Sequence, residues 1–98
     1  MNSEISGVVY VIKFSEKIAG HAGYYVGSTA LLRLNERFNE HCTGRGARLT
    51  EVAWERGIGM QIIHTVPTNT LKEARKLERT IKNRKSTSRW LKTQGVSL

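Results

Sequence analysis

The chain has 98 residues, a length typical of one domain, which leaves no room for a long inserted domain. It carries 16 lysines and arginines against 8 acidic residues, and the formal charge of +8 makes nucleic acid the leading candidate partner, because each neutralised phosphate releases counterions. The alternative is a charge that only keeps a soluble protein dispersed.

Cysteine content and hydropathy restrict the setting in which the protein works. Cys42 is the single cysteine, so no internal disulfide can form. No apolar stretch is long enough to span a membrane, and residues 1–6 lack the pattern of a signal peptide. We therefore expect a reducing, cytoplasmic setting and no membrane partner. A metal cluster built on thiolates is excluded, because His21, His41 and His64 are scattered without C-x-x-C or H-x-x-x-H spacing.

The first predicted elements form a β-hairpin. Residues 8–14 are mostly β-branched and aromatic, which favours a strand. Residues 15–23 contain two glycines and few apolar side chains, so we expect a hairpin loop there. Residues 24–26 then return as a second, antiparallel strand that ends at Gly27.

A helix is predicted after this hairpin. Ser28 or Thr29 can cap a helix that begins near Ala30. Its apolar side chains recur at helical spacing and predict one buried face, formed by Leu31, Leu34, Phe38 and Cys42. The Thr-Gly-Arg-Gly segment at residues 43–46 ends the helix.

A short helix and a third strand come next. Residues 47–56 predict a helix with Leu49, Val52 and Ala53 facing inward and Gly57 just past its end. Residues 60–66 predict a strand, which Pro67 ends.

The last long helix begins at Thr70, where Glu73 is placed to complete a capping box. Its predicted buried face consists of Leu71, Ala74, Leu77 and Ile81. Residues 85–98 are polar and basic, with Trp90 and Leu91 as anchors and loose final residues. We expect one domain over residues 1–98, with its core at about 7–85 and a basic tail at 86–98.

Three polar side chains on the first helix are spaced four residues apart. Arg33, Arg37 and His41 are each displaced by about 40° around the helix axis and predict one polar stripe, with Arg37 next to the buried face. Such a position suits a cation that reaches into a cleft. The alternative is a solvated edge, neutralised by Glu36 and Glu40.

Glu78 is predicted to project from the same side of the last long helix as its apolar face. A carboxylate in that place needs a partner, because burial of an unpaired charge is costly. The partner is either a metal ion or a nearby cation such as Arg75 or Lys82, and the helix alone does not decide between them.

Two tyrosines lie on the two strands of the predicted hairpin. The register of antiparallel strands can bring Tyr10 and Tyr25 to one face of the sheet. Taken singly, each is explained as well by packing in the core.

The ordered set of these residues resembles the GIY-YIG nuclease superfamily. Val8-Val9-Tyr10 stands where that family has Gly-Ile-Tyr, and Tyr25-Val26-Gly27 stands where it has Tyr-Ile-Gly. Arg37 and His41 match its Arg-x-x-x-His helix, and Glu78 matches its metal-binding glutamate. The match runs from Val8 to about Lys85 and looks most like small stand-alone members, including those of phages and mobile elements. Asn83 follows Glu78 too closely to match the asparagine of many members.

The resemblance implies an α+β fold with a small three-stranded antiparallel sheet flanked by helices. It also implies a metal-dependent endonuclease that hydrolyses phosphodiester bonds. Glu78 would hold one Mg²⁺ or Mn²⁺, Tyr10 would orient or deprotonate the attacking water, and His41 would assist that proton transfer. Tyr25 would hydrogen-bond the phosphate or water, Arg37 would pair with the scissile phosphate, and Gly27 would leave room for the substrate.

The expected substrate is DNA, held through its backbone with low sequence specificity unless a protein partner supplies more. The candidate backbone contacts are Arg45, Arg48, Lys82, Arg84, Lys85 and Arg89. One site per chain predicts nicking by a monomer or weak homodimer. The alternatives are an inactive nucleic-acid-binding module of the same fold and a small basic structural protein, such as a ribosome-associated one.

Overall fold

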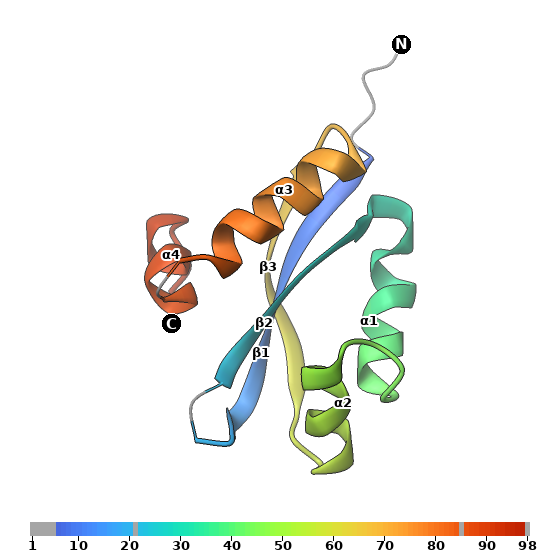
Figure 1. The fold of residues 1–98 in the computed structure, drawn as a ribbon, viewed down its shortest axis with the longest axis vertical. Coiled ribbons are helices and arrows are strands. Elements are labelled where there is room, and N and C mark those ends of the chain that lie inside the picture. Colours follow the sequence, from blue (N-terminus) through green and yellow to red (C-terminus); the bar gives the residue numbers. More distant parts are fainter. Residues whose placement is uncertain (1–5, 21, 85, 98) are drawn as a thin grey trace.

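The computed structural model describes residues 6–20, 22–84 and 86–97. Lys85, one of the predicted nucleic-acid contacts, lies outside the described residues. Three strands, β1 (Gly7–Ile18), β2 (Ala22–Ala30) and β3 (Met60–Thr68), form an antiparallel sheet in the order β2-β1-β3. Helices cover both of its faces (Figure 1). The predicted α+β fold with a small three-stranded antiparallel sheet is therefore confirmed.

The central strand β1 is buried on both faces, because successive side chains alternate between two cores. Val9 and Val11 pack in the first core, beneath α3 (Leu71–Lys82) and α4 (Thr87–Thr93). Tyr10 and Ile12 pack in the second core, on the side of α1 (Leu34–Cys42) and α2 (Arg48–Glu55). The sheet is thus the middle layer of the molecule (Figure 1).

The hairpin is longer than predicted. β1 continues to Ile18, and the turn lies at Ala19 and Gly20, whose φ angles are 54° and 80°. The expected loop at residues 15–23 contains this turn but was too long. Ser15, Glu16 and Lys17 are exposed and lie where the pairing of β1 with β2 is irregular, between Lys13 and Ile18. A hydrophobic pattern does not indicate a strand whose side chains are exposed.

The predicted start of the first helix was also wrong. β2 does not end at Gly27 but runs to Ala30, with Ser28 and Thr29 paired to β1. A 3-10 turn, η1 (Leu31–Arg33), then leads into α1, which has no side-chain cap. Leu34 and Phe38 pack against the second core, as predicted.

Pro67 lies inside β3 rather than at its end, and it pairs with Val8. An edge strand tolerates proline because its outer backbone groups need no sheet partner. The capping box of α3 is confirmed, since Thr70 Oγ1 accepts from the Glu73 N–H at 3.1 Å and the Thr70 N–H donates to Glu73 Oε1 at 3.2 Å.

The basic tail contains helix α4, which Ser86 caps through the Arg89 N–H. The predicted anchors Trp90 and Leu91 are 6 % and 0 % exposed and belong to the first core. Packed structure therefore continues past residue 85, where we expected the core to end. None of the helices in the described part of the chain is long and apolar enough to cross a membrane.

Candidate active site

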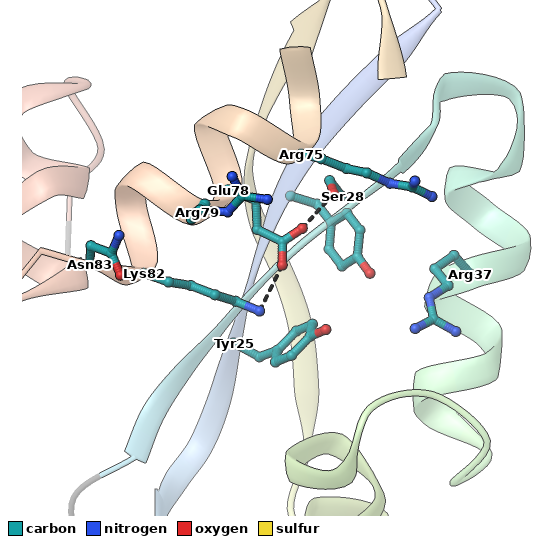
Figure 2. A pocket seen from close by; sticks show the side chains of 9 residues that line it. Tyr25, Ser28, Arg37, Arg75, Glu78, Arg79, Lys82 and Asn83 are labelled. Atoms are coloured by element: carbon teal, nitrogen blue, oxygen red, sulfur yellow. Dashed lines mark hydrogen bonds and ion pairs between the residues drawn. The ribbon is translucent and has the colours of Figure 1, made fainter. Parts of the chain in front are cut away.

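A cleft of about 480 Å³ lies between α1 and α3, over the edge strand β2 (Figure 2). Four of the predicted catalytic residues, Tyr10, Tyr25, Arg37 and Glu78, line it. The other lining residues are Ser28, Arg75, Arg79, Lys82 and Asn83. Residues far apart in the sequence, from two strands and two helices, therefore meet at one surface.

Tyr10 is almost completely buried, at 1 % exposure, and its hydroxyl contacts the fifth predicted catalytic residue. Tyr10 Oη lies 2.8 Å from His41 Nε2. Burial and the neighbouring Tyr25 raise the pKa of Tyr10 to about 12, while Arg37 opposes this shift. Tyr10 is therefore a neutral phenol at pH 7, and the tautomer of His41 decides whether its hydroxyl donates to the imidazole or accepts from it.

His41 is fully buried and hydrogen-bonded on both sides. Its Nδ1 lies 2.7 Å from Thr50 Oγ1, opposite the contact of its Nε2 with Tyr10. Burial first, and then Arg37, lower the pKa of His41 to about 4, so the ring is neutral at pH 7.

The predicted polar stripe of Arg33, Arg37 and His41 was therefore wrong at its last member. Arg33 precedes α1 and has backbone angles that are not α-helical, φ −101° and ψ 4°, so it does not continue the stripe. Along α1, each step of four residues rotates the side-chain direction by about 40°, which turns His41 toward the core. Sequence reasoning also missed Thr50, whose only signal is a small polar residue three positions before the inward Ala53.

The two tyrosines share one face, as the predicted register requires. Their ring centroids lie 6.4 Å apart, and the Tyr25 centroid is 5.0 Å from that of His41. Gly27 is paired with Tyr10 across the strands, and a Cβ on it would lie 2.5 Å from Tyr10 Oη. The glycine therefore clears space for the Tyr10 ring itself.

Glu78 points into the cleft, with its side chain 20 % exposed. Its Oε1 accepts a hydrogen bond from the Ser28 hydroxyl, and its Oε2 lies 2.7 Å from Lys82 Nζ (Figure 2). Lys82 Nζ also lies 5.2 Å from the centroid of the Tyr25 ring. Of the two cations considered as alternatives, Lys82 rather than Arg75 is the partner.

The donor set at Glu78 fits a hard cation that keeps most of its water. No group of three or more metal-ligating side chains of the His, Cys, Asp and Glu types occurs among the described residues. Structural zinc needs such a set, whereas Mg²⁺ binds through one or two carboxylates together with water and substrate phosphate. Glu78, on the wall of an open cleft, suits the second kind of site.

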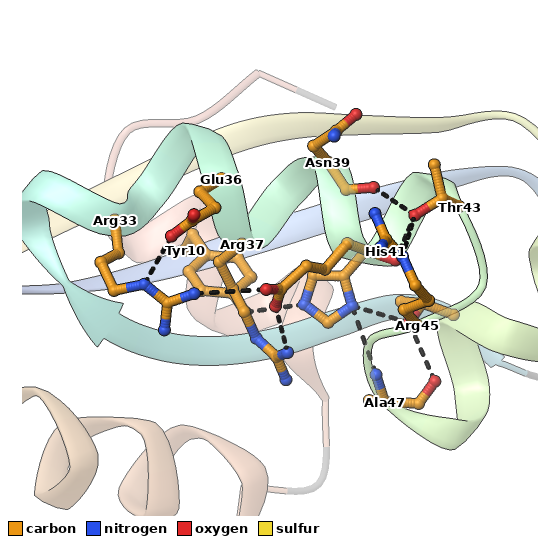
Figure 3. A network of polar contacts seen from close by, with 11 residues as sticks. Tyr10, Arg33, Glu36, Arg37, Asn39, His41, Thr43, Arg45 and Ala47 are labelled. Carbon is orange, nitrogen blue, oxygen red and sulfur yellow. Dashed lines mark hydrogen bonds and ion pairs between the residues drawn. The ribbon is translucent and has the colours of Figure 1, made fainter.

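Arg37 forms an ion pair with an acidic neighbour, as part of the polar network drawn in Figure 3. Its Nη1 lies 2.8 Å from Glu40 Oε1, which keeps the pKa of Glu40 below its usual range. Arg33 pairs with Glu36 at 2.7 Å and with Glu40 at 3.2 Å. The neutralising partners expected for a solvated edge are thus present, yet the guanidinium of Arg37 still lines the cleft.

The predicted nucleic-acid contacts are distributed unevenly. Lys82 lines the cleft, while Arg48 is 82 % exposed on α2 and paired with Glu51. The other described members, Arg45, Arg84 and Arg89, are exposed outside the cleft. Arg75 and Arg79 also line the cleft but were not among the predicted contacts. Arg75 lies three residues before Glu78, a spacing that placed it near the carboxylate, whereas Arg79 directly follows Glu78 and had no such signal.

Comparison with protein families explains this constellation. Residues 6–92 match the family model described as the GIY-YIG catalytic domain. Searches of curated proteins and of solved structures gave no match. The matched segment contains the whole cleft, from Tyr10 on β1 to Asn83 after α3, and the resemblance inferred from the sequence is confirmed. The chain belongs to the GIY-YIG family of nuclease domains.

Proposed function

We propose that this protein is a metal-dependent endonuclease that hydrolyses phosphodiester bonds in DNA. The observation that carries the proposal is the convergence of two tyrosines, an arginine and a half-buried carboxylate in one cleft, with a buried histidine behind Tyr10. Hydrolysis of a phosphodiester needs an activated water and stabilisation of charge on the phosphate. The cleft contains side chains that could meet both requirements, the activation of water and the stabilisation of charge.

Glu78 is the proposed ligand for Mg²⁺ or Mn²⁺, since it is the acidic side chain that lines the cleft. When bound, such an ion polarises a phosphate oxygen and stabilises the departing 3′ oxygen. Lys82 neutralises Glu78 in the present arrangement, and on release it is close enough to the cleft to contact a substrate phosphate.

Arg37, Tyr25 and Tyr10 are the proposed contacts to the reacting groups. Arg37 would pair with the scissile phosphate as its charge builds, and Tyr25 would donate a hydrogen bond to the phosphate or the attacking water. Because its pKa is raised to about 12, Tyr10 would not act as a free phenolate. It would instead orient the water and accept a proton from it while passing its own proton to His41.

The substrate backbone is proposed to run along α3. Four exposed cations on this helix, Lys72, Arg75, Lys76 and Arg79, form no ion pair with the acids of the described chain. Arg33, Arg37 and Arg48, by contrast, are each paired with an acid three residues further along the chain. Unpaired cations contact phosphates without reading bases, which supports low sequence specificity.

One set of the proposed catalytic residues in the described part of the chain supports nicking of one strand by a monomer or weak homodimer, with sequence preference supplied, if at all, by a protein partner. The second candidate function is nucleic-acid binding without cleavage. It is favoured by the Glu78–Lys82 ion pair, which gives the carboxylate a purely structural partner.

The experiment that separates these functions incubates the protein with supercoiled plasmid in Mg²⁺, Mn²⁺ or EDTA. Labelled duplex, single-stranded and branched DNA, with RNA alongside, define the substrate class. We expect open circles with either metal and none in EDTA. Binding of every substrate without cleavage of any would support the binding module and contradict the enzyme.

A further inference from the structure

Thr50 is a buried polar side chain to which the mechanism above gives no part. It lies on α2, is 0 % exposed, and is one of two buried residues of that helix, the other being Ala53. A purely apolar packing role at this position is filled equally well by valine, which has the same shape without the hydroxyl. The hydroxyl therefore calls for an explanation through its partners.

The hydroxyl of Thr50 has two partners and only one proton. Its Oγ1 lies 3.0 Å from the Ala47 carbonyl oxygen, to which it can only donate, and 2.7 Å from His41 Nδ1. Because Thr50 uses its one hydroxyl proton to donate to the Ala47 carbonyl, Oγ1 can only accept a hydrogen bond from His41, which requires a proton on Nδ1. The competing donor to Nδ1 is the Ala47 N–H at 3.5 Å, a contact at the limit of a hydrogen bond and much longer than that to Thr50.

The position of this proton determines what the other ring nitrogen can do. His41 is neutral at pH 7 and so carries one ring proton. When that proton is on Nδ1, Nε2 is a bare acceptor, and it faces Tyr10 Oη at 2.8 Å. Tyr10 then donates to His41, and the lone pairs of its oxygen stay available to a water in the cleft.

The ring is also fixed by the loop that precedes α2. A Cβ on Gly46 would lie 2.2 Å from His41 Nδ1, so the backbone of this loop packs directly against the imidazole. Figure 3 shows His41 between Tyr10 on one side and Ala47 on the other. A half-turn of the ring would put Cδ2 and Cε1 in the places of Nδ1 and Nε2, and it would break both short hydrogen bonds, to Tyr10 and to Thr50.

We propose that Thr50 is a positioning residue, which holds His41 in the Nδ1–H tautomer so that Nε2 can take the Tyr10 proton during cleavage. The proposal rests on the proposed function. In the step concerned, the water gives a proton to Tyr10 Oη as its oxygen bonds to phosphorus, and Tyr10 gives its own proton to Nε2. The bond from phosphorus to the 3′ oxygen breaks, that oxygen takes a proton from solvent, and His41 later returns one to solvent.

The test compares wild type with Thr50→Val, which removes the hydroxyl at constant shape, and Thr50→Ser, which keeps it. The tautomer of His41 is read from side-chain ¹⁵N chemical shifts without substrate, with His41→Asn to assign the signals. We expect Nδ1–H in wild type and Thr50→Ser, and Nε2–H in Thr50→Val. We expect Thr50→Val to lower kcat by about 10²-fold at unchanged KM, and Thr50→Ser to restore it.

An Nε2–H tautomer in wild type would overturn the proposal, as would a Thr50→Val protein with wild-type tautomer and kcat. If Thr50→Val does not fold, the wild-type and Thr50→Ser spectra decide alone. A wild-type protein that cleaves no substrate would contradict the proposed function instead. The ¹⁵N spectra report the tautomer without substrate, so they distinguish a failure of the proposed function from a failure of the proposed role of Thr50.

Discussion

Arg37 shows how one side chain can belong to a surface ion pair and still line a cleft. Its Nη1 contacts Glu40, while its guanidinium faces Tyr10 and Tyr25, both of which raise its pKa further. The pair is partly exposed and joins residues one helical turn apart, and ion pairs of this kind contribute little to stability. The pair itself therefore does not account for the position of Arg37 in the cleft, whereas the proposed contact with a substrate phosphate would.

Substitution of Arg37 tests this interpretation. Arg37→Ala is expected to slow cleavage by about 10²–10³-fold, the loss usual for one charge-stabilising donor. The matched control is Arg33→Ala, which also removes a partner of Glu40 but lies outside the catalytic cleft, and we expect little change. Equal rates for both variants in a plasmid assay would remove Arg37 from the mechanism.

His41 links the site to the pH dependence of folding. Its pKa falls from 6.5 to about 4 in the folded protein, so the unfolded chain binds more protons between those values. The contribution of neutral His41 to the free energy of unfolding should therefore be fully present above pH 6.5. It should be lost as the pH falls toward 4, which lowers the free energy of unfolding by about 3 kcal/mol. Urea denaturation across this range should show the loss in wild type and not in His41→Asn, which does not titrate. A flat wild-type profile would argue against a buried, neutral imidazole.

At the scale of elements, α3 and β2 show where the sequence was and was not sufficient. The capping box at Thr70 and the inward direction of Glu78 follow from spacing within one helix, and both were predicted. The length of β2 was not, because Gly27 suggests an end to the strand when its neighbours alone are considered. The reason for that glycine is the Tyr10 ring across the sheet, a contact that only the register defines.

The site was predictable to the same extent. The family motifs include Tyr10, Tyr25, Arg37 and Glu78, and the structure brings these four residues to one cleft. Thr50 and Arg75 belong to no motif. Their importance depends on which residues they contact in the folded protein, and the sequence does not show those contacts. Burial of His41 likewise could not be read from a stripe of polar residues.

The charge distribution of α3 gives a prediction at this scale. Arg75→Gln and Arg79→Gln should each weaken DNA binding and lower the slope of log K against log salt by roughly one. Arg48→Gln removes the same charge from a paired cation on α2 and should change neither quantity appreciably. Titrations at several salt concentrations measure both. A loss for Arg48→Gln equal to that for Arg75→Gln would move the binding surface to α2.

At the scale of the molecule, the cleft depends on both cores. Tyr10 packs with the second core, while Glu78 extends from a helix that packs on the first, so their approach depends on the whole three-layer arrangement. Helix α4 completes the first core, where Leu91 contacts no solvent. Helix α4 thus packs in the same core as α3, the helix that carries Glu78.

Leu91→Ala should lower the free energy of unfolding by about 2–5 kcal/mol, a cost usual for a leucine cavity. Leu32→Ala is the matched control, since Leu32 is 99 % exposed and its loss should cost less than about 0.5 kcal/mol. Guanidinium denaturation compares the two. Similar midpoints for both variants would mean that α4 does not contribute to the core.

The most direct test of the whole account is the rate of metal-dependent plasmid cleavage by Glu78→Gln. The amide keeps the shape of the carboxylate but removes the charge that would hold Mg²⁺ or Mn²⁺. The control, Glu51→Gln, makes the same change on α2, outside the cleft. We predict that Glu78→Gln folds, binds DNA and does not cut it, while Glu51→Gln cuts like wild type. Cleavage by Glu78→Gln at the wild-type rate would contradict the account.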